Sequence, residues 1–331
     1  MKWLIALAAL LLLVLALSLL ITLLLFKKVV CRYPADPLGE DEEAPVRMSK
    51  SWEPYRDTFQ QGKRWYLRAR RERAEIQSMD GIPLVGRIIR PEGEPVGCIL
   101  LMHGFHGSPC HDFGPIFSFY HDRGYLLLVP DERAHGESGG KYITYGIRER
   151  WDCLCWCRYL TERFGTEMPV FLDGISMGAA VVLMASSLPL PENVRGIIAD
   201  CGYTSPYDIM RHVLRHGFHL PVFPILGMAG LLCRLIAGFG LREYSTLEAM
   251  KTNTHPVLFV HGLADNFVPS YMTEQNYQAC RAEKQVMYVE GAGHGLSYLV
   301  KREECEARLE EFLDQHRGQA ETAEDNETEI T

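Results

Sequence analysis

Six short apolar runs, each about the length of one buried strand, recur along the chain from residue 96 onward. They occupy residues 96–102, 125–131, 169–174, 194–200, 256–262 and 285–291. Helix-like segments lie between or after most of them, at about 113–123, 144–164, 177–188, 270–283 and 297–315. Apolar strands that alternate with helices predict an α/β fold, with a mostly parallel sheet covered by helices on both faces. Such a sheet places its ligand site at the carboxyl ends of the strands.

Two segments depart from this alternation. Residues 75–90 have strand-like runs around Asp80-Gly81, which is typical of a hairpin. More than fifty residues separate the runs that end at 200 and begin at 256, and they include the apolar stretch 218–241. A second membrane span is one interpretation, but prolines, glycines and Arg234 within the stretch weaken it. We expect instead a helical lid over the strand ends, at about 203–250.

The N-terminus carries an apolar run without charge at residues 4–26, long enough to cross a bilayer as a helix. A cleaved signal peptide would have a shorter apolar region and small residues at a cleavage site. We therefore predict an uncleaved single-pass membrane anchor over residues 1–28. Lys27, Lys28 and Arg32 outnumber the positive charges before the run, which favours a cytoplasmic main domain. The ten cysteines show no spacing typical of disulfides, which agrees with a cytoplasmic location.

The remaining segments complete the predicted domain plan. Residues 29–75 are expected to form a juxtamembrane linker, acidic and proline-rich at 34–45, followed by a basic helix near 53–75. This helix contacts lipid headgroups in one interpretation and is a solvated helix at the domain edge in the other. The main domain is expected over 76–316, and the acidic tail 317–331 is expected to be disordered. A formal net charge of −8 and the lack of a basic stripe in the main body argue against a nucleic-acid partner.

The apolar run 169–174 ends at a glycine, and the sequence GISMG at 174–178 then leads into a helix of small residues. Serine between two glycines at a strand-to-helix turn is typical of a nucleophile elbow, where larger flanking side chains would collide. We therefore predict that Ser176 is a nucleophile held above the sheet. A serine in a purely structural turn is the other interpretation. An aspartate here would indicate a dehalogenase or epoxide hydrolase, whereas serine indicates acyl transfer.

A serine hydroxyl needs a base to take its proton, and in this arrangement the base follows the acid late in the chain. His294, in the sequence GAGHG after the last predicted strand, is expected to be the base. Asp265 follows the run 256–262 and is expected to orient His294 and stabilise its charged form. Asp200 is the alternative acid, although we expect its carboxylate to bond the loop 201–203.

The oxyanion of a tetrahedral intermediate needs fixed hydrogen-bond donors, usually backbone N–H groups. Met177, the residue after the nucleophile, is expected to supply one. The loop after the run 96–102 reads HGFHGS, and Phe105 is placed to supply the other. His103 and His106 in this loop are expected to shape it. No metal or organic cofactor is expected.

The segments HGFHGS, DERAHGES, GISMG, HGLADNFVP and GAGHG together resemble the α/β-hydrolase superfamily, over about residues 76 to 315. The chain is similar to membrane-anchored, esterase-like bacterial serine hydrolases, which are related to serine-aminopeptidase-like enzymes. The resemblance implies an α/β-hydrolase fold and these roles: nucleophile Ser176, acid Asp265, base His294, and oxyanion donors Phe105 and Met177.

The resemblance also implies a serine hydrolase, most similar to carboxylesterases and lipases, that cleaves carboxylic esters through an acyl-enzyme. Thioesters and amides stay open, because the same groups cleave them. The apolar lid and anchor suggest a small-molecule ester with a lipophilic acyl group, and the bilayer is the expected partner of the N-terminal helix. An aminopeptidase, which would need acidic groups near the cleft, or an acyltransferase is the alternative enzyme. A binding protein that lost catalysis is the remaining alternative.

Overall fold

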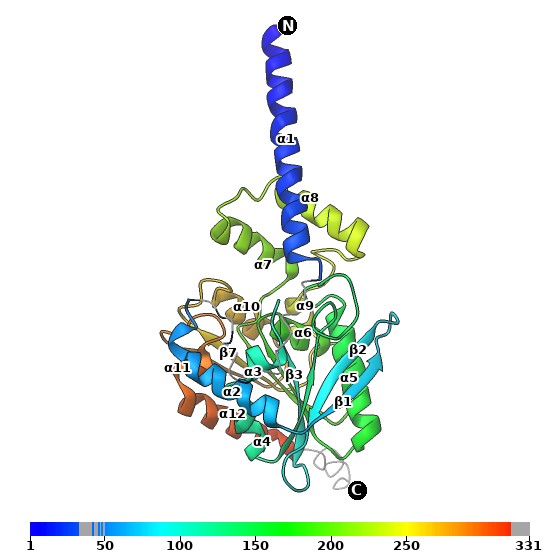
Figure 1. Cartoon of the computed structure of the whole chain (residues 1–331), viewed down its shortest axis with the longest axis vertical. Helices are drawn as coiled ribbons and strands as arrows, with labels where there is room; N and C mark the ends of the chain where they lie inside the picture. The colour runs from blue at the N-terminus through cyan, green and yellow to red at the C-terminus, as the bar shows by residue number, and fades with distance from the viewer. Residues whose placement is uncertain (33–41, 43–45, 47, 49, 319–331) are drawn as a thin grey trace, which may run out of the picture.

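The computed structural model describes residues 1–318 apart from 33–41, 43–45, 47 and 49. Eight strands form one central sheet among these residues, in the order β1-β2-β4-β3-β5-β6-β7-β8 (Figure 1). The strands are β1 (Arg71–Gln77), β2 (Pro83–Ile89), β3 (Gly97–Met102), β4 (Tyr125–Pro130), β5 (Val170–Ile175), β6 (Val194–Asp200), β7 (Val257–Gly262) and β8 (Lys284–Val289). Strands β3 to β8 are mutually parallel, while β1 and β2 form an antiparallel hairpin at one edge. The predicted mostly parallel sheet is therefore confirmed.

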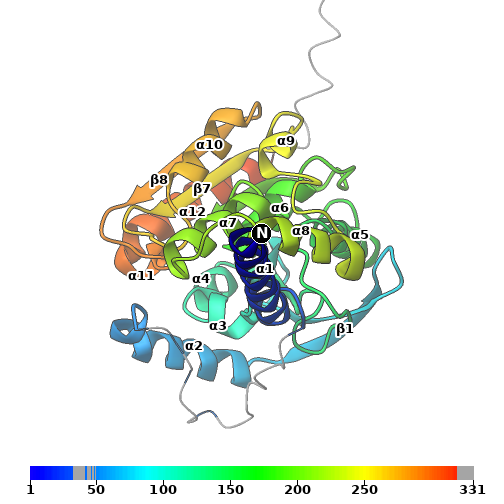
Figure 2. The same ribbon diagram turned by 90° about the horizontal axis from the view of Figure 1, so that it is seen from above.

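Helices cover both faces of this sheet (Figures 1 and 2). Helices α5 (Glu149–Phe164) and α6 (Met177–Ala185) pack on one face, and α4 (Phe117–Asp122) and α12 (Arg302–Arg317) pack on the other. Every residue of β3, β4, β5 and β7 is buried as a result, which explains why these sequences are apolar almost throughout. The other helices of the main domain are α2 (Arg56–Arg68), α3 (Pro109–Phe113), α10 (Tyr271–Ala279) and α11 (Ser297–Val300).

The helix expected at about 144–164 begins five residues later, at Glu149. Tyr145 and Gly146 have φ angles of 56° and 96°, in the left-handed region that a right-handed helix excludes. The Glu149 carboxylate accepts hydrogen bonds from the N–H groups of Thr144 at 2.7 Å and Gly146 at 2.8 Å. The loop is therefore fixed by the first residue of the helix that follows it.

The insertion between β6 and β7 contains helix α7 (Pro206–His212), helix α8 (Ile225–Leu232) and the short helix α9 (Thr246–Met250). A π-helical turn extends α7 over Val213–Gly217, and another extends α8 over Cys233–Ala237. Helices α7 and α8 lie beside the lower half of α1 (Lys2–Val29), at the end of the domain where α1 leaves it (Figure 1). Among the described residues α1 is the one helix long and apolar enough to cross a membrane, whereas the apolar Ile225–Ala237 is shorter.

The segment before the sheet differs from its predicted extent. Strand β1 starts at Arg71, inside the predicted juxtamembrane segment 29–75, because its pairing with β2 extends to Ile89. Helix α2 buries Phe59 and Tyr66 and packs on α3 and α4. Figure 1 places α2 along the flank of the domain, below the level at which α1 leaves it, as expected for a helix at the domain edge. Of the predicted linker 34–45 and tail 317–331, all but residues 42, 317 and 318 lie outside the described residues.

One buried carboxyl group in the sheet makes stability depend on pH. Asp173 in β5 accepts a hydrogen bond from the Tyr120 hydroxyl at 2.8 Å. Burial, reinforced by the charge of Asp200, raises the pKa of Asp173 from 3.8 to about 7. The folded protein therefore holds a proton that the unfolded chain releases, and stability is lost as the pH rises from about 4 through about 7.

We expect Asp173→Asn to remove this dependence, since the amide oxygen still accepts the Tyr120 bond. At pH 8 the free energy of unfolding should rise by roughly 2–4 kcal/mol, and at pH 4 it should change little. Chemical denaturation of both proteins in detergent at the two pH values measures the difference. An equal change at both values would show that Asp173 is not protonated in the folded state.

Candidate active site

Ser176 occupies the sharp turn between β5 and α6. Its φ and ψ angles are 57° and −112°, an unusual conformation for a residue other than glycine. A Cβ atom on Gly174 would lie 2.3 Å from the Gly178 carbonyl oxygen, and one on Gly178 would lie 1.8 Å from that of Met102. Glycine is therefore required at both positions: at 174 because the turn itself leaves no room, and at 178 because strand β3 lies so close.

The structure brings together the three side chains expected from the sequence. Ser176 Oγ lies 2.9 Å from His294 Nε2, and His294 Nδ1 lies 2.7 Å from Asp265 Oδ2. The three residues follow β5, β7 and β8, so the carboxyl ends of three parallel strands supply the site. The two distances are those of hydrogen bonds, and they form one continuous chain from hydroxyl to imidazole to carboxylate.

Asp265 is held in its ionised form by its surroundings. Its Oδ1 accepts hydrogen bonds from the N–H groups of Phe267 at 2.8 Å and Val268 at 2.9 Å. Burial raises the pKa of this carboxyl, but its interactions with His261, His294 and the Val268 N–H outweigh burial and hold the pKa well below its usual range. Oδ2 thus remains a negatively charged acceptor for the His294 ring.

The alternative acid, Asp200, lies close by but has other partners. Its carboxylate accepts a hydrogen bond from Ser297 Oγ at 3.2 Å, and its backbone carbonyl accepts one from the Ser176 N–H at 2.8 Å. Burial raises the pKa of Asp200 to about 6, in the opposite direction to Asp265. The Asp200 side chain therefore bonds Ser297 and not the loop 201–203 that we expected from the sequence.

The two expected oxyanion donors flank Ser176. Met177 is the first residue of α6, where backbone N–H groups have no acceptor within the helix. On the facing loop, the Gly104 N–H donates to Asp112 Oδ2 at 2.6 Å and the His106 N–H contacts His135 Nε2 at 3.2 Å. The Phe105 N–H between them has no hydrogen-bond partner among the described residues. A Cβ on Gly104 would lie 3.3 Å from Ser176 Cβ, which places this loop against the serine.

The histidines of this loop support its shape. His103 is fully buried; its Nδ1 lies 2.9 Å from the Gly104 carbonyl oxygen, and its Nε2 accepts the Glu132 N–H at 3.0 Å. The bond to Glu132 ties the loop after β3 to the loop after β4. His103 thus holds the backbone that presents Phe105, as expected from the sequence.

Trp52, far from the other site residues in sequence, also contacts the site. Its indole N–H donates to the His294 carbonyl oxygen at 3.0 Å. Its ring stacks on Phe59 and His111, with centroids 5.0 Å and 4.8 Å away. Gly295 has a φ of +64°, and a Cβ there would lie 3.1 Å from the Trp52 ring. The sequence offered no signal for this contact, because Trp52 follows a polar linker and belongs to no motif.

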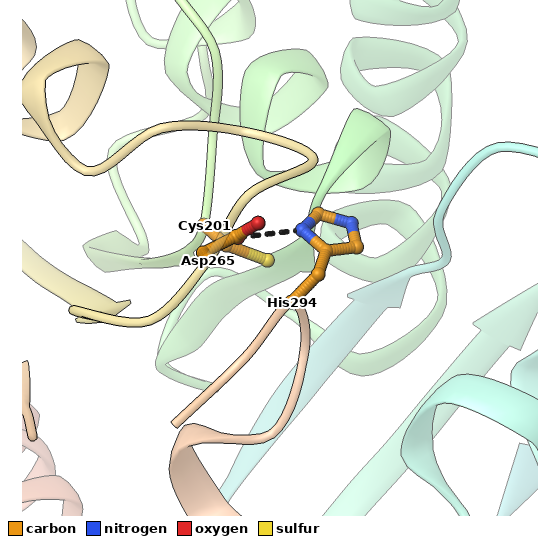
Figure 3. Close-up of side chains that lie close together, drawn as sticks. All are labelled: Cys201, Asp265 and His294. Carbon is orange, nitrogen blue, oxygen red and sulfur yellow. Dashed lines mark hydrogen bonds and ion pairs between the residues drawn. The ribbon is translucent and has the colours of Figure 1, made fainter. Parts of the chain in front are cut away.

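Cys201 lies beside Asp265 and His294 (Figure 3). Ligating atoms of Cys201, Asp265 and His294 lie within 4.8 Å of one another, and these residue types also bind zinc. Burial and the charge of Asp200 raise the pKa of the thiol well above its usual value, which keeps it neutral. Both nitrogens of the His294 ring are engaged, Nδ1 with Asp265 and Nε2 with Ser176. Asp265 is already engaged by His294 and two N–H groups. The group therefore fits an acid–base pair with a neutral thiol better than a metal centre.

Two hollows reach Ser176. The outer one is lined by polar and aromatic groups that include Trp52, His111 and His294. The inner one has a cavity volume of about 100 Å³. Apart from Ser176 its lining is apolar or aromatic: Leu25, Val29, Phe105, Tyr145, Tyr203, Ile209, Met210, Val213, Leu214, Phe218, Ile225, Leu226, Ala229, Phe267 and Val268. We call this hollow the apolar cavity.

Comparisons with known proteins identify the family of the chain. The model of the prolyl oligopeptidase family (Peptidase_S9) matches residues 111–320, more than half of the chain. The uncharacterized protein YqkD of Bacillus subtilis is 29% identical over 239 residues, 72% of this chain and 78% of YqkD. The monoglyceride lipase of Rattus norvegicus is 28% identical over 129 residues, 37% of this chain and 40% of the lipase.

Solved structures show the same fold. The Pyrococcus furiosus esterase Pf2001 superposes with a TM-score of 0.62 at 24% identity, over 83% of this chain and 98% of the esterase. The chain therefore has the α/β-hydrolase fold and belongs to the prolyl oligopeptidase family.

Proposed function

We propose that the protein is a serine hydrolase that cleaves carboxylic esters, with Ser176 as nucleophile, His294 as base and Asp265 as acid. The unbroken hydrogen-bonded chain from Ser176 to Asp265 carries this proposal. His294 Nε2 takes the hydroxyl proton as Ser176 Oγ bonds to the acyl carbon, and then gives it to the departing alkoxide. Water enters in place of the alcohol, and its oxygen bonds to the acyl carbon as His294 takes one of its protons. The bond between the acyl carbon and Ser176 Oγ then breaks, Ser176 regains a proton from His294, and the carboxylic acid leaves.

The charges that arise in this sequence have partners in the site. The ionised Asp265 stabilises His294 while the imidazole carries the second proton. The backbone N–H groups of Phe105 and Met177 would donate to the oxyanion of each tetrahedral intermediate. Both donors are backbone groups fixed by their loops, so they need no rearrangement when charge develops.

The lining of the cavities favours an ester with an apolar acyl group over a substrate with a free amine. The apolar cavity contains no carboxylate among its described lining residues. In the outer hollow Asp112 already accepts hydrogen bonds from Gly104 and pairs with His111. An aminopeptidase would need an available acid to hold the substrate amine. The esterase and monoglyceride lipase among the similar proteins support the same choice.

Helix α1 supports a membrane location for this activity. It is 28 residues long, and residues 1–17 are exposed and almost entirely apolar. We propose a single-pass anchor, with the catalytic domain on the cytoplasmic side, where Lys27, Lys28 and Arg32 are favoured.

A covalent probe tests the proposal. The full-length protein in detergent micelles is treated with a fluorophosphonate, and the modified peptide is identified by mass spectrometry. We expect one adduct, on Ser176, together with turnover of p-nitrophenyl esters. A folded protein that neither reacts nor hydrolyses any ester from acetate to palmitate would refute the proposal and support a binding protein.

Trp52 is expected to act as a positioning residue for His294. Trp52→Phe keeps the aromatic stack and removes the hydrogen bond to the His294 carbonyl, whose net worth is about 1 kcal/mol. We therefore expect kcat to fall roughly three- to tenfold with little change in KM, and fluorophosphonate labelling to slow in parallel. Trp65→Phe is the matched control, because Trp65 stacks on Phe117 instead of the site. Equal rates for the two variants would remove Trp52 from this role.

A further inference from the structure

The last turns of α1 contribute directly to the apolar cavity. Leu25 and Val29 line it together with Ser176 and residues of α7 and α8. The adjacent Leu24 points away from it and is 61% exposed. The helix thus has one side toward the cavity and one toward the surroundings of the domain.

The end of α1 is firmly attached to the domain. The Ile143 N–H donates to the Val30 carbonyl at 2.7 Å, and the Tyr145 hydroxyl donates to the Val29 carbonyl at 2.6 Å. The Arg32 N–H donates to the Lys141 carbonyl at 2.8 Å, and its guanidinium donates to carbonyl groups of the loop 135–140. These bonds fix where Leu25 and Val29 lie relative to Ser176.

The insertion between β6 and β7, which we call the lid, packs along α1 through its helix α8 above this attachment. Ser18, Thr22 and Phe26 follow one another at helical spacing and are buried, and Thr22 Oγ1 lies 4.0 Å from Met228 Sδ of α8. Ser18 and Thr22 are the two polar residues within 4–26. Small polar residues are typical of helix contacts inside membranes. The stripe therefore indicates that α8 meets α1 at membrane depth.

The length of the exposed part of α1 also places the contact between α8 and α1 at membrane depth. The exposed residues 3–17 extend about 22 Å at 1.5 Å per residue. A bilayer has a hydrocarbon core about 30 Å thick and needs about 20 residues to span it. The hydrocarbon must therefore reach beyond Leu17, to the turns of α1 that contact α8.

The outer surface of the lid fits this environment. Large apolar side chains are exposed on and around α8: Phe223 at 86%, Leu231 at 56%, Leu235 at 72% and Ile236 at 48%. The only acid in 206–241 is Asp208, while Arg211, Arg215 and Arg234 are exposed cations in the same stretch. Lys28 Nζ lies 5.7 Å from the centre of the Phe218 ring. An apolar surface with surrounding cations suits the interface of a membrane that contains anionic lipids.

We propose that α1 is a wall of the acyl-binding cavity, and that the site takes the acyl chain of a membrane-resident lipid ester directly from the bilayer, between α1 and the lid. This inference rests on the proposed ester hydrolysis. It specifies the substrate class as an amphiphilic ester whose acyl chain remains in apolar surroundings from bilayer to cavity, while its polar alcohol group faces the outer hollow.

Chain-length selectivity of the full-length protein in phospholipid nanodiscs tests the inference. The substrates are p-nitrophenyl esters from acetate to palmitate. Leu25→Trp places a bulky indole ring in the cavity, and Leu24→Trp makes the same change on the exposed side of the same helix turn. We expect the ratio of kcat/KM for palmitate to that for acetate to fall at least tenfold in Leu25→Trp and to stay within twofold of the wild type in Leu24→Trp.

A second pair of variants, in α8, tests the inference independently in case substitutions in α1 prevent folding. Ala229→Trp fills the cavity from α8, and Leu231→Trp changes an exposed position of that helix. Selective loss of palmitate turnover in either cavity variant that folds supports the inference. Unchanged ratios in both cavity variants, with normal fluorophosphonate labelling, would overturn it and leave ester hydrolysis intact. A wild type that is not labelled would overturn both.

Discussion

Alanine in place of Ser176 is expected to reduce kcat for p-nitrophenyl butyrate by about 10⁵-fold or more, the scale of nucleophile loss in serine hydrolases. The change removes the only atom that is to bond with the acyl carbon, while His294, Asp265 and the backbone donors stay in place. A residual rate above that of water is still expected, because oxyanion stabilisation and substrate binding do not need the hydroxyl.

The measurement compares full-length wild type and Ser176→Ala at equal concentration in detergent, with thermal unfolding as the test of folding. Ser297→Ala is a useful comparison, since it removes a hydroxyl that bonds Asp200 and should leave kcat within about tenfold. If Ser176→Ala kept more than about one hundredth of wild-type activity, the nucleophile would have to be another residue.

Asp265→Asn is expected to lower kcat about 10³- to 10⁴-fold with little effect on folding. The amide oxygen still accepts the N–H groups of Phe267 and Val268, so the loop is preserved. The neutral amide cannot stabilise the imidazolium of His294, and it can hold the ring in the wrong tautomer. Loss of the charge at Oδ2 therefore acts on the transition state and not on substrate binding.

Asp200→Asn is the matched control for this variant, because both aspartates are buried near His294. The Asp200 carboxylate accepts its side-chain hydrogen bond from Ser297, whereas Asp265 bonds His294 directly, so replacing Asp200 with an amide of the same shape should leave kcat within about tenfold. The outcome that would reverse the assignment is a large loss in Asp200→Asn together with near-normal turnover in Asp265→Asn.

Local patterns in the sequence predicted the strands and the site because each has a short-range physical cause. Burial on both faces makes β3, β4, β5 and β7 apolar almost throughout, and steric conflict demands glycine at 174 and 178. The chain order of nucleophile, acid and base then follows from the order of the strands. These features can be recognised without knowing which distant segments touch.

The features that were missed depend on contacts between distant segments. The start of β1 at Arg71 is set by pairing with β2, and the contact of Trp52 with His294 joins residues 242 positions apart. The late start of α5 follows from left-handed backbone at Tyr145 and Gly146, which a tyrosine does not signal. Ser18 and Thr22 in the apolar run were the available sign that α1 packs against protein as well as lipid.

The attachment of α1 has a consequence for how this anchor can be exchanged. In a tethered enzyme the spanning helix is a replaceable module, and any apolar sequence of suitable length serves. Here Leu25 and Val29 line the cavity, and Arg32 and Val30 bond the loop 135–145, so α1 and the hydrolase domain form one unit. Replacing α1 with a foreign spanning helix would therefore change the wall of the cavity as well as the attachment to the membrane.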